Sequence, residues 1–142
     1  MPPPSIWGPP LWKVLHGIGV MSGRNPLLRN DSERESLWLI THLEYILPCK
    51  ECTDHYIQFK KTNPIPKSYT TLGEWICALH NSVNVKLDKD IVPFSPEVAA
   101  DVKGDWALFL ASVKDSILLR LINGDKLREY TRHMSLWIQY SM

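Results

Sequence analysis

Apolar residues recur every three or four positions along most of this chain, and this spacing constrains the fold more than any other feature. It is the period of an amphipathic α-helix, and it predicts helices over about residues 9–21, 31–47, 49–61, 72–87, 105–121 and 125–139. The chain has no internal repeat and no strand-like alternation of any length. We therefore expect an all-α fold in which short loops join the first four helices, as in a four-helix bundle.

Prolines and glycines mark the ends of these segments. Five prolines occur within the first ten residues, so we expect an extended arm there. Residues 88–96 lack the helical pattern, and a short helix is expected to open at Pro96 and Glu97. Asn123-Gly124 should break the chain between the last two helices.

Length and charge limit the kinds of function that the chain can have. Its 142 residues are enough for one domain with a substantial core. The net charge of +1, with acids and bases intermixed, argues against nucleic acid as a partner. The apolar runs are too short for a membrane span, and the proline-rich start does not resemble a secretory signal. We therefore expect an intracellular protein.

The motif Pro48-Cys49-Lys50-Glu51-Cys52 is the strongest chemical signal in the sequence. If Cys49 opens a helix after Pro48, the helix dipole favours its thiolate form and makes it reactive. A structural zinc half-site is the alternative, but there is no second Cys-x-x-Cys, and His42 and His55 do not form a paired motif. A thioredoxin-like role would need βαβ units, and the pattern predicts none. The motif therefore indicates redox chemistry or, less well, a metal.

Two groups of ring-bearing and amide side chains fall on predicted helices. His80 and Asn84 are four residues apart and share a face, with Asn81 one step round the helix. Trp12 and His16 form a similar pair on the first helix. Each group by itself is more typical of a helix edge or a half-buried core position. Their occurrence together with the cysteine pair favours a slot for a flat cofactor.

The chain resembles the Erv/ALR family of FAD-linked sulfhydryl oxidases, most of all the compact members encoded by large DNA viruses. Three blocks in the same order carry the resemblance: Trp-Gly-Pro-Pro-Leu-Trp-Lys-Val-Leu-His at residues 7–16, Leu-Pro-Cys-Lys-Glu-Cys at 47–52, and Trp-Ile-Cys-Ala-Leu-His-Asn-Ser-Val-Asn-Val-Lys-Leu at 75–87. The similarity extends over about residues 7 to 94.

The resemblance implies a four-helix bundle that binds FAD, within a domain of residues 1–100, and no metal. Residues 101–142 would be a helical extension that packs on this domain or forms a dimer contact. Cys49 and Cys52 would be the catalytic pair. The residues implied for cofactor binding are Gly8, Trp12, His16, Tyr45, Cys77, His80, Asn81, Val83, Asn84, Lys86 and Leu87. Phe94 and Trp106 are weaker candidates for a late aromatic contact.

The implied reaction is the oxidation of protein dithiols to disulfides, with O₂ reduced to H₂O₂. Substrate would attack Cys49, and Cys52 would pass the electrons to FAD. The chain departs from many relatives because Cys77 has no partner cysteine, and Phe94 stands near the place of the partner. Shuttle cysteines are also missing, so a dithiol partner, such as a small thioredoxin-like or Cys-x-x-Cys protein, would supply electrons directly.

The resemblance further implies a homodimer and, if the chain is viral, a place in the host cytoplasm and the virion. The alternative function is a non-catalytic helical interaction module in which the Cys-x-x-Cys is structural. Flavin colour in the purified protein would distinguish the two.

Overall fold

Helices make up most of the chain in a computed structural model, which describes residues 4–96, 101–118 and 120–142. The α-helices are α1 (Pro4–Met21), α2 (Arg29–Thr41), α3 (Lys50–Thr62), α4 (Leu72–Lys86), α5 (Val102–Leu118) and α6 (Gly124–Ser141). Short 3₁₀ turns are η1 (Pro26–Leu28), η2 (Leu43–Ile46) and η3 (Tyr69–Thr71). The described residues include no strand, which confirms the predicted all-α fold. None of the described helices is long and apolar enough to cross a membrane.

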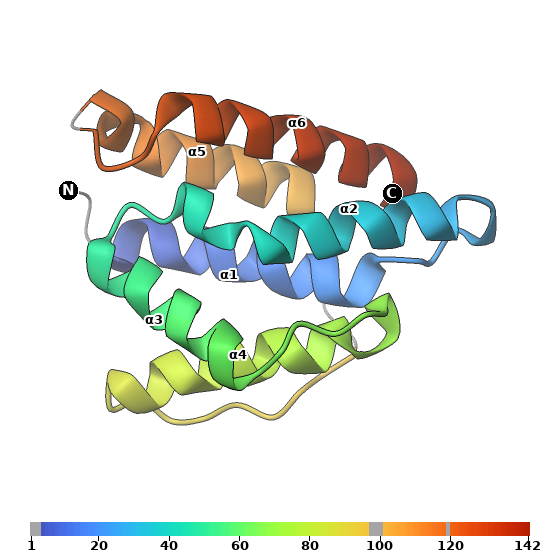
Figure 1. Cartoon of the computed structure of the whole chain (residues 1–142), viewed down its shortest axis with the longest axis horizontal. Coiled ribbons are helices and arrows are strands. Elements are labelled where there is room, and N and C mark those ends of the chain that lie inside the picture. Colours follow the sequence, from blue (N-terminus) through green and yellow to red (C-terminus); the bar gives the residue numbers. More distant parts are fainter. Residues whose placement is uncertain (1–3, 97–100, 119) are drawn as a thin grey trace.

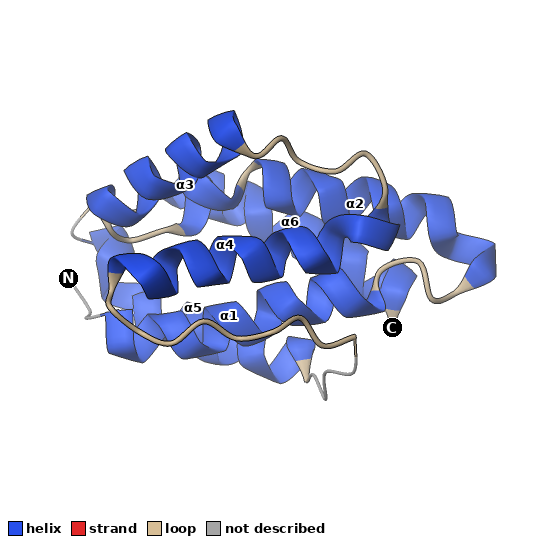
Figure 2. Ribbon diagram, turned by 90° about the horizontal axis from the view of Figure 1, so that it is seen from below, coloured by secondary structure: helices blue, strands red, loops and turns tan. Residues whose placement is uncertain are grey.

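The helices stack in pairs, one layer on another (Figure 1). α1 and α2 form the middle layer, α5 and α6 cover one side of it, and α3 and α4 lie on the other side. Direct packing joins α1 to both α4 and α5, and α2 to α6. After α4 the chain runs back along that helix without regular structure, as predicted for residues 88–96 (Figure 2).

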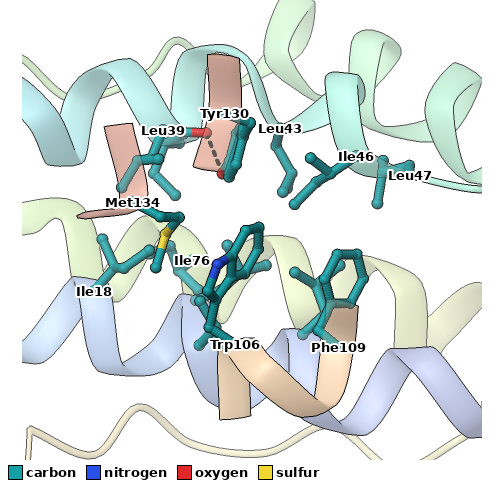
Figure 3. Close-up of a cluster of buried hydrophobic side chains, with 14 of the residues drawn as sticks. Ile18, Leu39, Leu43, Ile46, Leu47, Ile76, Trp106, Phe109, Tyr130 and Met134 are labelled. Carbon is teal, nitrogen blue, oxygen red and sulfur yellow. Dashed lines mark hydrogen bonds between the residues drawn. The ribbon is translucent and has the colours of Figure 1, made fainter. Parts of the chain in front are cut away.

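A large part of the core lies between the middle layer and the α5–α6 hairpin (Figure 3). Phe109, Met134 and Trp137 are fully buried there. The Tyr130 hydroxyl donates a hydrogen bond to the Leu39 carbonyl at 2.7 Å, and burial raises the pKa of this phenol, so it remains a donor. Each such side chain stabilises the fold by about 1.5–3 kcal/mol relative to an exposed position. Much of the apolar stripe of the last two helices is therefore buried inside the chain.

The first helix begins at Pro4, so the predicted extended arm is wrong for residues 4–10; residues 1–3 lie outside the described residues. Pro9 and Pro10 lie inside α1 and cannot donate to the carbonyls four residues earlier. Trp7 and Leu11 are only 5% and 3% exposed. The burial of these side chains offsets the two missing hydrogen bonds.

The predicted helix over residues 31–47 is two elements, α2 and η2, and it begins earlier, at Arg29. The break is at His42, whose φ of −108° and ψ of 21° leave the helical region. Leu43 and Ile46, three residues apart, remain buried in η2. A three-residue spacing fits a 3₁₀ turn as well as an α-helix, so the apolar pattern could not reveal the break.

The last two helices also have different boundaries from those predicted. α5 begins at Val102 and ends at Leu118. Asn123 caps the start of α6, where its side-chain oxygen accepts from the backbone N–H groups of Asp125 at 2.9 Å and Lys126 at 3.0 Å. The predicted break at Asn123-Gly124 does lie between the two helices, although Asn123 caps the start of α6 rather than ending α5. The helix expected at Pro96 and Glu97 falls on residues 97–100, outside the described residues.

Candidate active site

The paired cysteines lie where the chain enters α3. Cys49 is the N-cap of this helix, with extended backbone, and its sulfur accepts from the Cys52 N–H at 3.4 Å. Its carbonyl accepts from the Thr53 hydroxyl at 3.1 Å. The predicted helix start after Pro48 is therefore confirmed within one residue. The sulfur of Cys49 is held at the helix N-terminus, where the dipole favours negative charge.

Cys52 is a thiol that holds its proton firmly. All three cysteines of the chain are free thiols in this structure, and Cys49 and Cys52 are half-buried. Burial, followed by the hydrogen bond and charge of Cys49, raises the pKa of Cys52 to about 12, although the Lys86 ammonium opposes this rise. A reduced Cys52 therefore stays protonated at neutral pH unless a neighbouring group takes the proton.

His55 lies one helical turn after Cys52 and reaches α4. Its Nε2 is 3.0 Å from the Ser82 hydroxyl oxygen, and that hydroxyl donates to the Leu79 carbonyl at 2.6 Å. Burial, followed by the charge of Lys86, lowers the pKa of His55, which favours the neutral ring. From sequence, His55 was considered only as a zinc ligand. Its contact with Ser82 depends on how α3 crosses α4, which local spacing does not encode.

The rings predicted on α1 and α4 meet in space. Trp12 stacks on His80, with ring centroids 4.0 Å apart and planes 8° apart. His16 Nε2 is 2.9 Å from His80 Nδ1. Burial, followed by the charges of His16 and Lys89, lowers the pKa of His80 to about 4, and burial lowers the pKa of His16. Both imidazoles are thus neutral at pH 7, and one N–H···N hydrogen bond joins them.

A cavity of about 200 Å³ lies between α1, α4 and the segment of residues 91–95, which we call the strap. Asn81 holds the strap by two hydrogen bonds: its amide nitrogen donates to the Val92 carbonyl at 2.7 Å, and the Val92 N–H donates to its amide oxygen at 2.8 Å. The Cys77 thiol donates to the same carbonyl at 3.5 Å. The lining residues are His16, Val20, Gly73, Cys77, His80, Asn81, Val92, Pro93, Phe94 and Ser95.

Two glycines set how closely the cavity walls approach each other. A Cβ on Gly19 would lie 2.7 Å from the Gly73 Cα, so α1 and α4 are in backbone contact here. A Cβ on Gly73 would lie 3.0 Å from the Phe94 ring. A larger residue at either position would separate the helices or displace the strap.

Four of the residues predicted to bind cofactor line the cavity, namely His16, Cys77, His80 and Asn81, and the weaker candidate Phe94 joins them. Trp12 lies just beyond, stacked on His80.

The other α4 residues predicted to bind cofactor lie toward the end of that helix. Asn84 is buried and donates to the Asn81 amide oxygen at 3.4 Å. Val83 is half-buried, and Lys86 and Leu87 are exposed.

The remaining predicted residues lie away from the cavity lining. Tyr45 lies in η2, and the Lys126 ammonium of α6 is 5.0 Å from its ring centroid. Gly8 is buried in α1, and a Cβ there would meet nothing within 4 Å. Trp106 is 6% exposed and stacks on Phe109 in the core, which removes it as a candidate for a contact at this cavity.

The donor set around the cavity fits FAD. Stacked rings, a neutral histidine pair and side-chain amides match flat heterocycles with hydrogen-bonding edges. Lys86 and Lys89, near the end of α4, would be the groups to supply positive charge for a diphosphate. The volume is below the roughly 300–1,000 Å³ of typical ligand pockets, so the enclosed part of the site suits one ring system. The described residues contain no group of three His, Cys, Asp or Glu that could hold a metal ion.

Comparison with known proteins gives one consistent match. The sequence model of the Erv1/Alr family matches residues 9–107. FAD-linked sulfhydryl oxidase ERV1 of Oryza sativa subsp. japonica is 32% identical over 83 residues, covering 58% of this chain and 42% of the rice protein. FAD-linked sulfhydryl oxidase of African swine fever virus (isolate Tick/Malawi/Lil 20-1/1983) is 30% identical over 90 residues, covering 63% of this chain and 74% of the viral protein.

A yeast relative gives similar figures. FAD-linked sulfhydryl oxidase ERV2 of Saccharomyces cerevisiae is 34% identical over 82 residues, covering 56% of this chain and 40% of the yeast protein. The chain thus spans less than half the length of the rice and yeast relatives. No solved structure matches it.

Proposed function

The chain belongs to the Erv1/Alr family, and we propose that it is a FAD-linked sulfhydryl oxidase that converts protein dithiols into disulfides. The names of its relatives support this activity. The observation that carries the proposal is that α4 bears His80 and Asn81 of the cavity and also Ser82, which bonds to His55 on the helix of the redox pair, α3. One helix thus supports both the redox pair and the ring-binding residues.

The chemistry of the cysteine pair begins from its disulfide form. A substrate thiolate attacks the Cys49 sulfur, the Cys49–Cys52 bond breaks, and Cys52 leaves as a thiolate. A second substrate thiolate then attacks the substrate sulfur of this mixed disulfide and releases Cys49. The substrate leaves as a disulfide, and the pair keeps two electrons. The assignment of Cys49 as the attacked sulfur rests on its place at the helix N-terminus.

The second half of the reaction reoxidises the pair. FAD, when bound, supplies an acceptor for the two electrons and the chemistry that reduces O₂ to H₂O₂. Cys52 is the sulfur proposed to face the cofactor, because burial raises its pKa and sets it apart from the N-terminal position of Cys49. The proton of Cys52 must leave before its sulfur can act as a nucleophile.

The residues proposed to hold FAD are those of the ring cluster and their neighbours. Trp12 and His80 present aromatic faces, and His16 and Asn81 offer hydrogen-bonding groups at the rim. The full proposed set is Gly8, Trp12, His16, Tyr45, Cys77, His80, Asn81, Val83, Asn84, Lys86 and Leu87.

Substitution of each redox cysteine tests the function. Cys49→Ser and Cys52→Ser should each abolish thiol-dependent oxygen uptake, while the purified protein keeps the yellow flavin absorbance. Full turnover in either variant would contradict the relay. A colourless wild-type protein that contains zinc would instead favour the interaction module with a structural Cys-x-x-Cys.

The partner, assembly and location are further proposals. A dithiol partner such as a small Cys-x-x-Cys protein would reduce Cys49 directly, because the chain has no other cysteine pair. If the chain is viral, as several of its relatives are, we propose a place in the host cytoplasm and the virion. A homodimer is proposed from the family resemblance, and a monomeric mass in sedimentation would contradict it.

A further inference from the structure

Where α3 and α4 lie against each other, a hydrogen bond joins His55 of α3 to Ser82 of α4. Cys52 and His55 are three residues apart on α3, and Ser82 and Lys86 are four residues apart on α4, so each pair lies on one helix face. His55 bonds to Ser82, and the charge of Lys86 acts on both Cys52 and His55. The redox thiol therefore lies on the same face of α3 as the imidazole that contacts α4.

The hydrogen bond to Ser82 fixes which nitrogen of His55 carries the hydrogen. The only hydrogen of the Ser82 hydroxyl is donated to the Leu79 carbonyl, because a carbonyl cannot donate. The Ser82 oxygen must then accept from His55, which puts the hydrogen on Nε2. The lone pair of a neutral ring is consequently on Nδ1. Within the described part of the chain, no group forms a hydrogen bond with this nitrogen.

We propose that His55 is the base that removes the proton from the Cys52 thiol when the reduced cysteine pair is reoxidised. In this step the S–H bond of Cys52 breaks and an N–H bond forms at His55 Nδ1. The electron pair of the broken bond stays on sulfur, so the proton transfer itself oxidises nothing. This assignment rests on the oxidase function proposed above.

The charges around His55 suit a base that passes its proton on. Lys86 on α4 disfavours a second positive charge on the ring and stabilises the thiolate of Cys52. Cys49 and Glu51 on α3 oppose Lys86, because they raise the pKa of Cys52. The His55 ring is half-exposed, so the proton can leave from it to solvent. The imidazole therefore returns to the neutral form before the next cycle.

Replacement of His55 by Gln tests the proposal with a measurement that a merely structural role would not change. At neutral pH, His55→Gln should lower the rate of flavin reduction by excess dithiol by about 100-fold, the lower end for loss of a general base. The wild-type rate should rise with pH as His55 loses its proton and then level off. The variant should lack this rise, and its deficit should shrink at high pH, where the thiol ionises without help.

A second variant and a control complete the test. His55→Asp supplies a weaker base, so the rise of its flavin-reduction rate with pH should occur at lower pH than in the wild type. This variant decides the question if His55→Gln does not fold. Asp54→Asn is the matched control, because Asp54 is next to His55 but 65% exposed, and it should keep the wild-type profile. Variants of His55 with the wild-type rate and pH profile would overturn the proposal. An inactive wild-type protein would instead refute the oxidase function.

Discussion

The polar part of the α3–α4 contact, around Cys52, His55 and Ser82, differs sharply in burial from the α5–α6 hairpin. At the α3–α4 contact, Cys52, His55 and Ser82 are only half-buried. In the hairpin, Trp137 and Met134 are fully buried against the middle layer. A thiol that must give up its proton during the reaction needs access, whereas packing energy depends on excluding water. The difference indicates that the polar contact around Cys52 serves chemistry, whereas the hairpin core serves stability.

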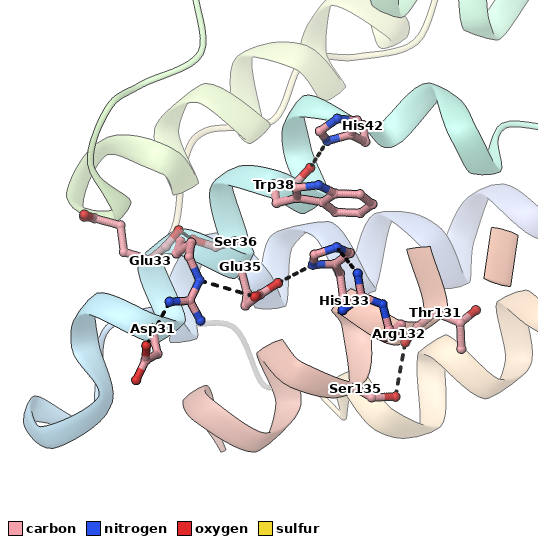
Figure 4. Close-up of polar contacts among 11 residues, drawn as sticks. Asp31, Glu33, Glu35, Ser36, Trp38, His42, Thr131, Arg132, His133 and Ser135 are labelled. Carbon is pink, nitrogen blue, oxygen red and sulfur yellow. Dashed lines mark hydrogen bonds and ion pairs between the residues drawn. The ribbon is translucent and has the colours of Figure 1, made fainter. Parts of the chain in front are cut away.

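Histidine illustrates the same contrast, because His133 in the hairpin is fully engaged by its neighbours (Figure 4). Its Nδ1 lies 2.5 Å from a carboxylate oxygen of Glu35, which is 4% exposed. Its ring stacks on Trp38 with centroids 3.6 Å apart, and His42 stacks on Trp38 as well, at 4.2 Å. His55, by comparison, has one ring nitrogen bound to Ser82 and one without a described partner. The first arrangement stabilises a helix contact, and the second leaves a nitrogen available for proton transfer.

The largest expected effect on stability comes from the hairpin core. Trp137→Ala should lower the free energy of unfolding by about 3–5 kcal/mol, since it opens a cavity and removes the donor that bonds the Ser22 hydroxyl at 2.9 Å. Urea unfolding measures the loss, and oxygen uptake per folded molecule should stay near the wild-type value. Leu108→Ala, at a side chain 62% exposed on α5, is the control. Loss of activity in the folded fraction would show that the hairpin core also affects the chemistry at the α3–α4 contact.

The next effect comes from the buried pair in the hairpin. His133→Ala leaves the Glu35 carboxylate buried without its closest partner, which should destabilise the fold by about 3 kcal/mol. Arg128→Ala on the same helix should have little effect, because Arg128 and its partner Asp125 are 80% and 88% exposed. Thermal unfolding of both variants measures the difference. Equal melting temperatures would mean that this pair contributes nothing to holding α6.

A smaller, pH-dependent effect is expected at the cavity. The pKa of His80 is about 4 in the folded protein, below its ordinary 6.5, so folding disfavours protonation of this ring. Its contribution to stability is present above pH 6.5 and is lost as the pH falls toward 4. Urea unfolding at pH 7 and pH 4.5 should show a larger acid loss for the wild type than for His80→Gln. Parallel losses would remove His80 as a source of the acid sensitivity.

The smallest expected effect is at Cys77. Cys77→Ser should leave thiol oxidation largely intact, because a hydroxyl can still donate to the Val92 carbonyl and Asn81 keeps both of its bonds to the strap. Oxygen uptake and flavin content measure the outcome. A large loss of turnover with flavin still bound would mean that Cys77 is a working thiol, which would extend the redox chemistry to the cavity.

Local sequence patterns predicted which helices exist more reliably than the residues at which each helix begins and ends. The apolar period and Pro48 led to α3 with Cys49 at its start, and the structure agrees. The same period missed the break at His42, because it fits a 3₁₀ turn equally well. It also missed the first turns of α1, where burial of Trp7 outweighs the proline signal.

The candidate site was predictable only where its residues share one helix. Trp12 with His16, and His80 with Asn81, are visible as pairs in the sequence. Three hydrogen bonds of the site cannot be seen in the sequence. They join His16 to His80, Asn81 to the Val92 carbonyl, and His55 to Ser82. Each joins residues from separate segments of the chain.

The sequence by itself determined that this protein is all-α and that Cys49 begins a helix, because both follow from local causes: the apolar period, a proline and a helix N-terminus. The tertiary structure decided which helices pack together, where the strap lies and which nitrogen of His55 carries a hydrogen. These features depend on contacts between distant parts of the chain, and such contacts form only when the helices pack to exclude water from their apolar faces.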